Sequence, residues 1–145
     1  STGYYKEQLE PLIDGDRIRI TGEVDERAKQ PFLAGAAALL FPIDWPEPFG
    51  LVMIEAMACG TPVIAFPHGA VPEVLEDGVS GFIVANEDEA VQAVKRVREL
   101  DRAKVRQAFE RRFTARRMAN DYVELYQKLL EGSPVLSASA DPAPA

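Results

Sequence analysis

The segment from Trp45 to Ala65 constrains the fold of this chain more than any other part of the sequence. Pro46 and Pro48 disfavour helical backbone in the residues before them, so Glu47 is expected in an extended loop and a helix can begin only after Pro48. Gly60 is typical of the end of such a helix, and the apolar residues that follow it favour a buried strand. The segment therefore predicts a ligand-binding loop, a helix and a strand, in that order.

The start of this helix has the features of an anion-binding site. Phe49, Gly50 and Leu51 open the helix, and Gly50 has no side chain to keep a ligand away from the first backbone N–H groups. These N–H groups and the positive end of the helix dipole favour a phosphate. Glu55 lies five residues beyond Gly50, roughly 7 to 8 Å further along the helix axis. Glu47 and Glu55 can therefore accept hydrogen bonds from hydroxyl groups on either side of a phosphate, as in a sugar, a diphosphate and a ribose.

The two glutamates also carry a family resemblance. They are separated by seven residues, with Pro-Phe-Gly-Leu after the first and Ala-Met-Ala-Cys-Gly-Thr-Pro-Val-Ile-Ala after the second. This pattern resembles the signature of the retaining glycosyltransferases of family 4, the group 1 glycosyl transferases. Members have the GT-B architecture of two facing Rossmann-like domains, and the resemblance, from about Tyr4 to Glu131, is to the C-terminal, donor-binding domain.

The resemblance implies an α/β fold, a Rossmann-like parallel sheet flanked by helices, as an incomplete C-terminal domain of the GT-B fold. Residues 1–131 would form the nucleotide-sugar-binding domain, without its N-terminal strands. Residues 132–145 are rich in Ser, Ala and Pro, and are expected to form a disordered tail.

Roles for individual residues follow from the same resemblance. Glu47 would act as the catalytic residue that contacts hydroxyls of the transferred sugar, and the backbone of Phe49, Gly50 and Leu51 would hold sugar and diphosphate oxygens. Glu55 would accept hydrogen bonds from the ribose hydroxyls. The alternative interpretation is a solvated loop acid and a helix-surface acid, without a ligand.

The implied activity is the transfer of a hexosyl group from a nucleotide-diphosphate sugar to an acceptor, with retention of configuration. The nucleotide sugar is a substrate, so we expect no cofactor, and no metal-ligand spacing is present. The resemblance also implies that the acceptor-binding N-terminal domain is absent from this chain, so we expect the chain to be inactive alone, as a fragment. Two alternatives stay open: a non-catalytic nucleotide-sugar-binding or interaction module, and a GT-B epimerase or phosphorylase.

Charge and composition narrow the list of partners. The 145 residues include 16 basic and 23 acidic side chains, a net charge of −7, which argues against a nucleic-acid partner. The apolar runs are too short for a membrane-spanning segment. We expect a cytoplasmic location, with peripheral contact of the whole enzyme with a membrane left open. The single cysteine, Cys59, is expected to be a small buried thiol.

Apolar periodicity and turn residues predict the remaining elements. Four strands are expected, at residues 17–21, 39–42, 63–66 and 81–84, and helices at residues 4–12, 26–34, 49–58, 87–100, 102–112 and 118–129. The loops that follow the strands should lie at the carboxyl edge of the sheet, where open parallel sheets bind ligands.

Two of these loops carry further candidates. By the resemblance, the backbone of Val24 would lie near the nucleobase, although a plain strand-to-helix turn explains this residue equally well. His68 is the only histidine and a tempting general base. A loop histidine without a visible partner is more often an exposed bystander, and this is the interpretation we prefer.

Overall fold

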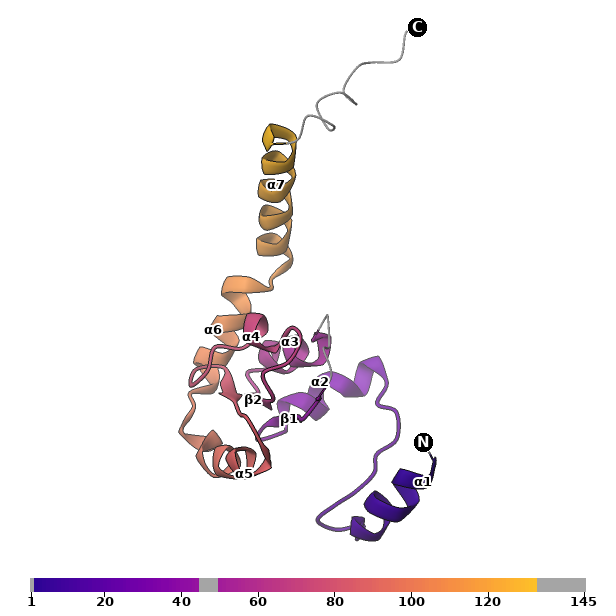
Figure 1. The fold of residues 1–145 in the computed structure, drawn as a ribbon. Coiled ribbons are helices and arrows are strands. Elements are labelled where there is room, and N and C mark those ends of the chain that lie inside the picture. The colour runs from indigo at the N-terminus through magenta and orange to yellow at the C-terminus, as the bar shows by residue number, and fades with distance from the viewer. Residues whose placement is uncertain (1, 45–49, 133–145) are drawn as a thin grey trace, which may run out of the picture. The chain divides into compact units, whose positions relative to one another are not determined.

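The structure is a computed structural model that describes residues 2–44 and 50–132 of the chain. The chain divides into two compact units, Ser1–Phe32 and Leu33–Ala145 (Figure 1). All of the buried hydrophobic residues among those described belong to the second unit, which also contains the sheet. Of the expected tail at residues 132–145, Gly132 is described and belongs to a helix, and residues 133–145 lie outside the described residues.

The first unit opens with a continuous helical stretch and a turn. The stretch consists of α1 (Thr2–Tyr4), the π-helix η1 (Tyr5–Leu9) and the 3-10 helix η2 (Glu10–Leu12), and it confirms the helix predicted at residues 4–12. Asp14 then turns the chain, because its Oδ1 accepts from the backbone N–H groups of Asp16, Arg17 and Ile18 at 2.9, 2.7 and 2.9 Å.

The strand predicted at residues 17–21 is wrong, since the backbone there is irregular. Asp14 takes the N–H groups of Arg17 and Ile18, which a sheet ladder would need. Ile18 and Ile20 are 49% and 57% exposed, so these alternating apolar side chains are not buried against the described residues. An alternating pattern thus forms a strand only where a neighbouring strand accepts its hydrogen bonds.

Helix α2 (Glu26–Ala34) begins at the predicted residue. The side chain of Asp25 accepts from the backbone N–H of Ala28 at 2.8 Å, which satisfies one of the donors at the start of the helix. Asp25 therefore caps α2.

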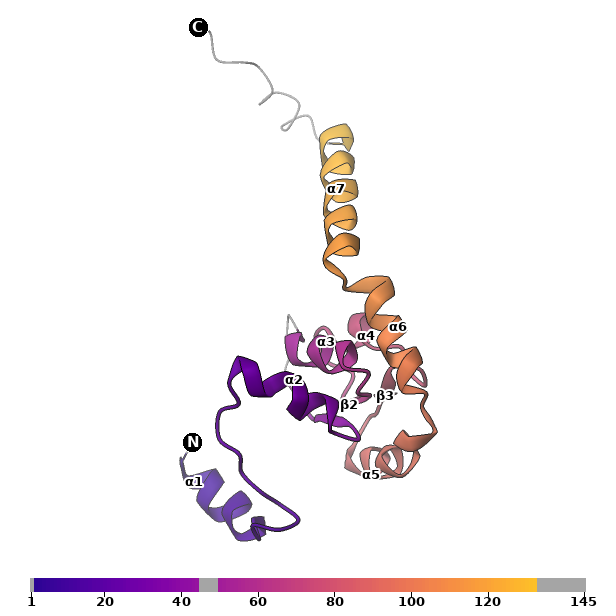
Figure 2. The same cartoon turned by 180° about the vertical axis from the view of Figure 1, so that it is seen from behind.

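The sheet consists of three short parallel strands, β1 (Leu39–Phe41), β2 (Val63–Ala65) and β3 (Gly81–Ile83), in the order β1-β2-β3. Figure 2 labels β2 and β3. The register pairs Phe41 with Ala65, and Ala65 with Ile83. These strands lie within three of the four predicted segments. The predicted fold class, a Rossmann-like parallel sheet flanked by helices, is confirmed.

Helix α3 (Leu51–Ala58) connects β1 to β2 and ends at the predicted glycine. Gly60 has a φ of 71°, which a side chain would disfavour. Its N–H donates to the carbonyl of Met57 at 2.9 Å, and the N–H of Thr61 donates to the carbonyl of Ala56 at 2.9 Å. This pair of bonds is the Schellman motif, which satisfies the last carbonyl groups of the helix.

The helices that follow β2 and β3 belong to the second unit. They are α4 (Val71–Val74), α5 (Glu87–Arg96) with the 3-10 turn η3 (Val97–Glu99), α6 (Arg102–Arg112) and α7 (Ala115–Gly132). Asn86 caps α5 by accepting from Glu89 N–H at 2.9 Å, and Asp101 caps α6 by accepting from Ala103 N–H at 2.9 Å.

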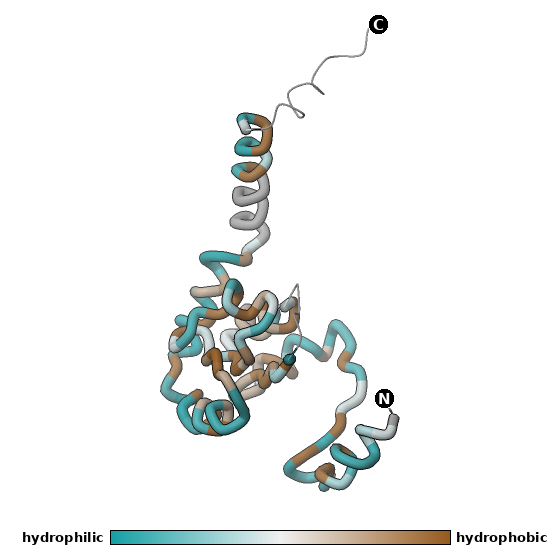
Figure 3. The backbone as a smooth tube through the Cα atoms, viewed as in Figure 1, coloured by the Kyte–Doolittle hydropathy of each residue, from teal (hydrophilic) through white to brown (hydrophobic). Residues whose placement is uncertain are grey.

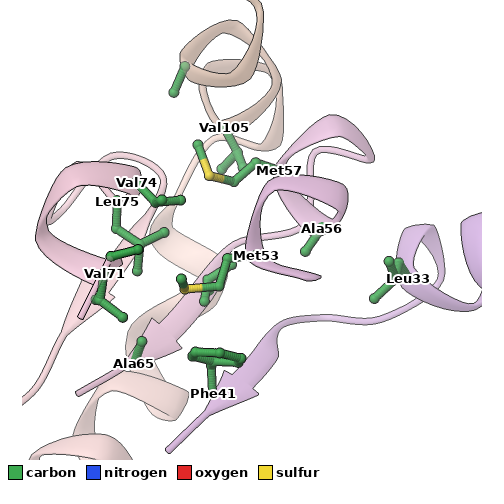
Figure 4. Packing of buried hydrophobic residues seen from close by; sticks show 13 residues of the cluster. Leu33, Phe41, Met53, Ala56, Met57, Ala65, Val71, Val74, Leu75 and Val105 are labelled. Atoms are coloured by element: carbon green, nitrogen blue, oxygen red, sulfur yellow. The ribbon is translucent and has the colours of Figure 1, made fainter. Parts of the chain in front are cut away.

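Alternate residues of β2 belong to two hydrophobic clusters, one on each face of the sheet. Val63 and Ala65 belong to the larger cluster, with Met53 and Met57 of α3, Val105 of α6 and residues of α4 (Figure 4). Ile64 belongs to the smaller cluster, with residues of β3 and α5. All three residues of β2 are buried, whereas Leu40 of β1 is 56% exposed, so β1 is less buried than β2.

Two arginines of α6 bind the carboxyl ends of other helices. Arg102 donates to the carbonyl groups of Ala34 and Ala36 at 2.9 and 2.7 Å, and to the buried Thr61 hydroxyl at 2.9 Å. Arg106 donates to the carbonyl of Ala58 at 2.6 Å. Each guanidinium therefore lies where the negative end of a helix dipole favours a cation.

Helix α7 has exposed apolar side chains. Figure 3 shows alternating brown and teal turns along its C-terminal part. Val123, Leu125, Tyr126, Leu129 and Leu130 are each at least 40% exposed. The helical spacing predicted for residues 118–129 is confirmed as a helix.

Replacement of Gly81 by alanine should destabilise the second unit strongly. An ideal Cβ on Gly81 would lie 1.8 Å from the carbonyl oxygen of Val63, so β3 must move away from β2. We expect a loss of at least about 3 kcal/mol in the free energy of unfolding, measured by chemical denaturation. Gly132→Ala is the control, because nothing lies within 4 Å of its added methyl group. Equal losses in both variants would contradict the close approach of β3 to β2.

The turn at Asp14 should depend on pH. The backbone N–H groups of Ile18 and Asp16 hold the pKa of the Asp14 carboxyl below its usual value. Because this pKa is lower in the folded chain than in the unfolded one, the turn is stabilised above the unfolded pKa and loses that stabilisation as pH falls through the folded pKa. NMR titration of the Asp14 carboxyl carbon should give a midpoint below about 3.9. A midpoint at or above this value would contradict the hydrogen bonds.

Candidate functional site

The candidate site lies at the carboxyl edge of β1 and β2. The register pairs Phe41 with Ala65, the last residues of the two strands, so the chain leaves both strands at the same level. Each strand is followed by a loop that leads into a helix, α3 after β1 and α4 after β2. Ligands of open parallel sheets bind in this position.

Gly50 sets the start of α3. Its φ of 58° and ψ of 30° are left-handed, so the helix begins at Leu51 rather than at residue 49 as predicted. The carbonyl of Gly50 accepts from the N–H groups of Met53 and Ile54 at 3.1 and 3.2 Å. The N–H groups of Leu51 and Val52 precede these first intrahelical bonds and so belong to the donors that a helix start offers to a ligand. The side chain of Leu51 is 64% exposed.

The starts of α3 and α4 lie next to each other. Gly50 is buried, and an ideal Cβ on it would lie 3.7 Å from the Cβ of Ala70 and 3.6 Å from Val74 Cγ2. Ala70 is the residue immediately before α4. The two strand-to-helix connections therefore pack against each other at one edge of the sheet.

A second contact joins the two loops. Nε2 of His68, in the loop after β2, lies 3.1 Å from Oδ1 of Asp44, in the loop after β1. The interpretation of His68 as a bystander without a partner is therefore wrong in this respect, although its side chain is 42% exposed. The sequence contains a signal that this contact could have been expected. Asp44 and His68 each stand three residues after the last residue of their strand, and those last residues are paired.

Glu55 lies on α3, is half-buried, and stands five residues beyond Gly50. Its position along the helix axis is about 7.5 Å from that glycine. The structure thus brings together Gly50, Leu51 and Glu55 of the predicted site on one helix and its N-terminal residue.

The other predicted site residues are not joined to this group. Glu47 and Phe49 lie outside the described residues, and their roles stay predictions. Val24 is half-buried in the loop before α2 and belongs to the first unit, so its role beside a nucleobase also stays a prediction.

A hollow of about 520 Å³ lies elsewhere, between β3 and α5. Among its lining residues, Asp77 accepts from the N–H of Ile83 at 2.9 Å and Glu89 accepts from the N–H of Ala85 at 2.7 Å. Arg96 lies 5.0 Å above the ring of Phe82. Because these groups already bind the chain itself, we place the candidate site at the carboxyl edge rather than in this hollow.

Two further properties concern the described residues only. Within residues 2–44 and 50–132, no group of three or more His, Cys, Asp or Glu side chains could hold a metal ion. No helix in the same ranges is long and apolar enough to span a membrane.

Comparison with known proteins identifies a family pattern over most of the chain. The model of the family described as Glycosyl transferases group 1 matches residues 2–100. A phosphatidyl-myo-inositol mannosyltransferase of Mycobacterium leprae is 39% identical over 90 residues, which are 61% of this chain and 24% of the relative. An N-acetyl-alpha-D-glucosaminyl L-malate synthase of Bacillus anthracis is 31% identical over 124 residues, 79% of this chain and 32% of the relative.

A solved structure shares the fold. The sucrose-phosphate synthase of Thermosynechococcus elongatus superposes with a TM-score of 0.70 at 30% sequence identity, over 92% of this chain and 36% of that protein. The chain thus spans about a quarter to a third of the length of these two curated relatives.

Replacement of Gly50 by alanine should reduce stability through two effects. Alanine is disfavoured at a φ of 58°, and its Cβ would lie 2.5 Å from Cε of the buried Met53. We expect a loss of about 1–3 kcal/mol in the free energy of unfolding, measured by chemical denaturation. The control is Gly78→Ala, where φ is 79° and nothing lies within 4 Å. A smaller loss for Gly50→Ala than for Gly78→Ala would contradict the packing at the start of α3.

Proposed function

This chain belongs to the group 1 glycosyltransferases, and from this premise we propose that it contributes the donor-binding part of an enzyme that transfers a hexosyl group from a nucleotide-diphosphate sugar with retention of configuration. The observation that carries the proposal is the start of α3, where Gly50 is left-handed and the first N–H groups precede the intrahelical bonds. In this proposal the donor's diphosphate binds there.

In this proposal the two glutamates of the sequence pattern bind opposite ends of the donor. Glu55 is half-buried on α3, and its distance along the axis suits a ribose whose phosphates lie at Gly50. Its carboxylate can accept hydrogen bonds from both ribose hydroxyls. Glu47 would contact the transferred sugar. We do not treat the two acids as a hydrolase pair, because Glu55 is placed for the ribose and not for the anomeric carbon.

The relatives support a hexosyl group as the group that is transferred. The names of two of them specify a mannosyl and an N-acetyl-glucosaminyl group, and both are derived from six-carbon sugars. The chain corresponds to about a quarter to a third of these relatives. We therefore propose that the acceptor is bound by an N-terminal domain outside these residues and that the 145-residue chain alone is inactive. We propose separately that the enzyme works in the cytoplasm.

The proposal is tested by calorimetric titration of the chain with UDP, GDP, ADP and their glucose and mannose conjugates. Binding of one diphosphate series supports the donor-site role and identifies the base. Inorganic phosphate is titrated in the same way, and an affinity for it equal to that for the diphosphates would contradict the proposal.

Glu55→Ala should weaken binding of the preferred diphosphate about 10- to 100-fold, because a carboxylate that accepts from ribose hydroxyls is lost. The matched control is Glu99→Ala on η3, which removes the same charge away from the carboxyl edge. It corrects for the weaker repulsion between the phosphates and a chain of net charge −7. Equal affinities for Glu55→Ala and Glu99→Ala would contradict the role of Glu55.

A further inference from the structure

The contact between Asp44 and His68 joins two loops that the sheet itself does not join. The β1–β2 pairing ends at Phe41 and Ala65, and the two side chains meet three residues beyond these ends. The exposed fractions of the His68 and Asp44 side chains are 42% and 87%, so the pair lies at the surface of the carboxyl edge.

Each loop is also folded by a short-range bond of its own. The N–H of Ile43 donates to the carbonyl of Phe41 at 3.0 Å, and the N–H of His68 donates to the carbonyl of Phe66 at 2.8 Å. The rings of Phe66 and His68 meet edge to face, with their centroids 6.4 Å apart. These local contacts orient the imidazole, but they do not connect one loop with the other.

We infer that Asp44 and His68 are positioning residues, which hold the two loops together and thereby fix Gly50 and the first turn of α3. The link from the pair to Gly50 runs through α4 and the residue before it. Gly50 lies against Ala70 and Val74, and the N–H of Val71 donates to the carbonyl of His68 at 3.2 Å. A shift of the His68 loop therefore moves the surface on which Gly50 rests.

The exposure of the Asp44 and His68 side chains limits how much their contact can stabilise the fold. Exposed ion pairs contribute little to global stability. The pair should therefore act on the local order of the helix start much more than on unfolding. This separates a positioning role from a general structural one.

The first experiment measures hydrogen exchange, in the 145-residue chain, of the backbone amides of Met53 and Ile54, which donate to the carbonyl of Gly50 at the start of α3. His68→Ala and Asp44→Ala should each accelerate exchange there about two- to fivefold, and the double variant should do no more than either single change. In His68→Gln, the amide nitrogen can take the place of Nε2, so this variant should restore slow exchange. Arg111→Ala, which breaks the 2.8 Å pair of Arg111 with Glu76, is the control and should leave these amides unchanged.

Unchanged exchange in both single variants overturns the inference. So does acceleration that is simply additive in the double variant, because it would assign independent roles to the two residues. This measurement involves no nucleotide, so its outcome does not depend on the proposed function.

The second experiment rests on the proposed function and uses the nucleoside diphosphate that binds best. His68→Ala and Asp44→Ala should weaken its affinity by similar factors, about two- to fivefold, with no further loss in the double variant. Rescue by His68→Gln supports positioning. A larger loss in His68→Ala than in Asp44→Ala, without rescue, would overturn it and make His68 a direct ligand contact. Absence of binding to the unaltered chain would count against the proposed function, while amide exchange still decides the role of the pair.

Discussion

The in-register parallel pairing of β1 and β2 is the constraint on which the candidate site depends. Because Phe41 and Ala65 are opposite each other, both loops leave the sheet at one level, and both helices start beside each other. A shift of the register would move the loop after β1 along the sheet and separate Asp44 from His68. The buried β2, packed on both faces, holds this register because Val63 and Ala65 face one hydrophobic cluster and Ile64 faces the other.

Much of this arrangement could be predicted from the sequence, because its signals are local. Proline and glycine residues precede and follow the segment that forms α3, and Asp25 and Asp101 cap their helices. The three observed strands are short apolar runs, which favour buried strands. The segment at residues 17–21 shows the limit of such signals. Its alternation suits a strand, but pairing depends on residues distant in the sequence, and the side chain of Asp14 binds two of its N–H groups instead.

The candidate site shows the same division between local and distant causes. The sequence identifies Gly50, Leu51 and Glu55 because their spacing on one helix decides their geometry. It did not identify the partner of His68, since that contact joins residues 24 positions apart and depends on the register. Likewise, Gly50 packs against Ala70 of another loop, and this contact cannot be seen in the sequence. From the sequence alone, the approach of a ligand is the only reason for a glycine at this position. The structure adds a second reason, which is the space taken by Met53.

The charge of the site gives the contact between Asp44 and His68 a further significance. The chain carries a net charge of −7, and Asp44 stands on a loop of the edge where the proposed diphosphate binds. A helix start offers only about half a positive charge, so a nearby unpaired carboxylate would offset much of its attraction for phosphate. The imidazole of His68, whose Nε2 lies 3.1 Å from Oδ1 of Asp44, gives this carboxylate a polar partner on the side of His68. One contact can therefore both hold the two loops together and reduce the repulsion that a phosphate would meet at this edge.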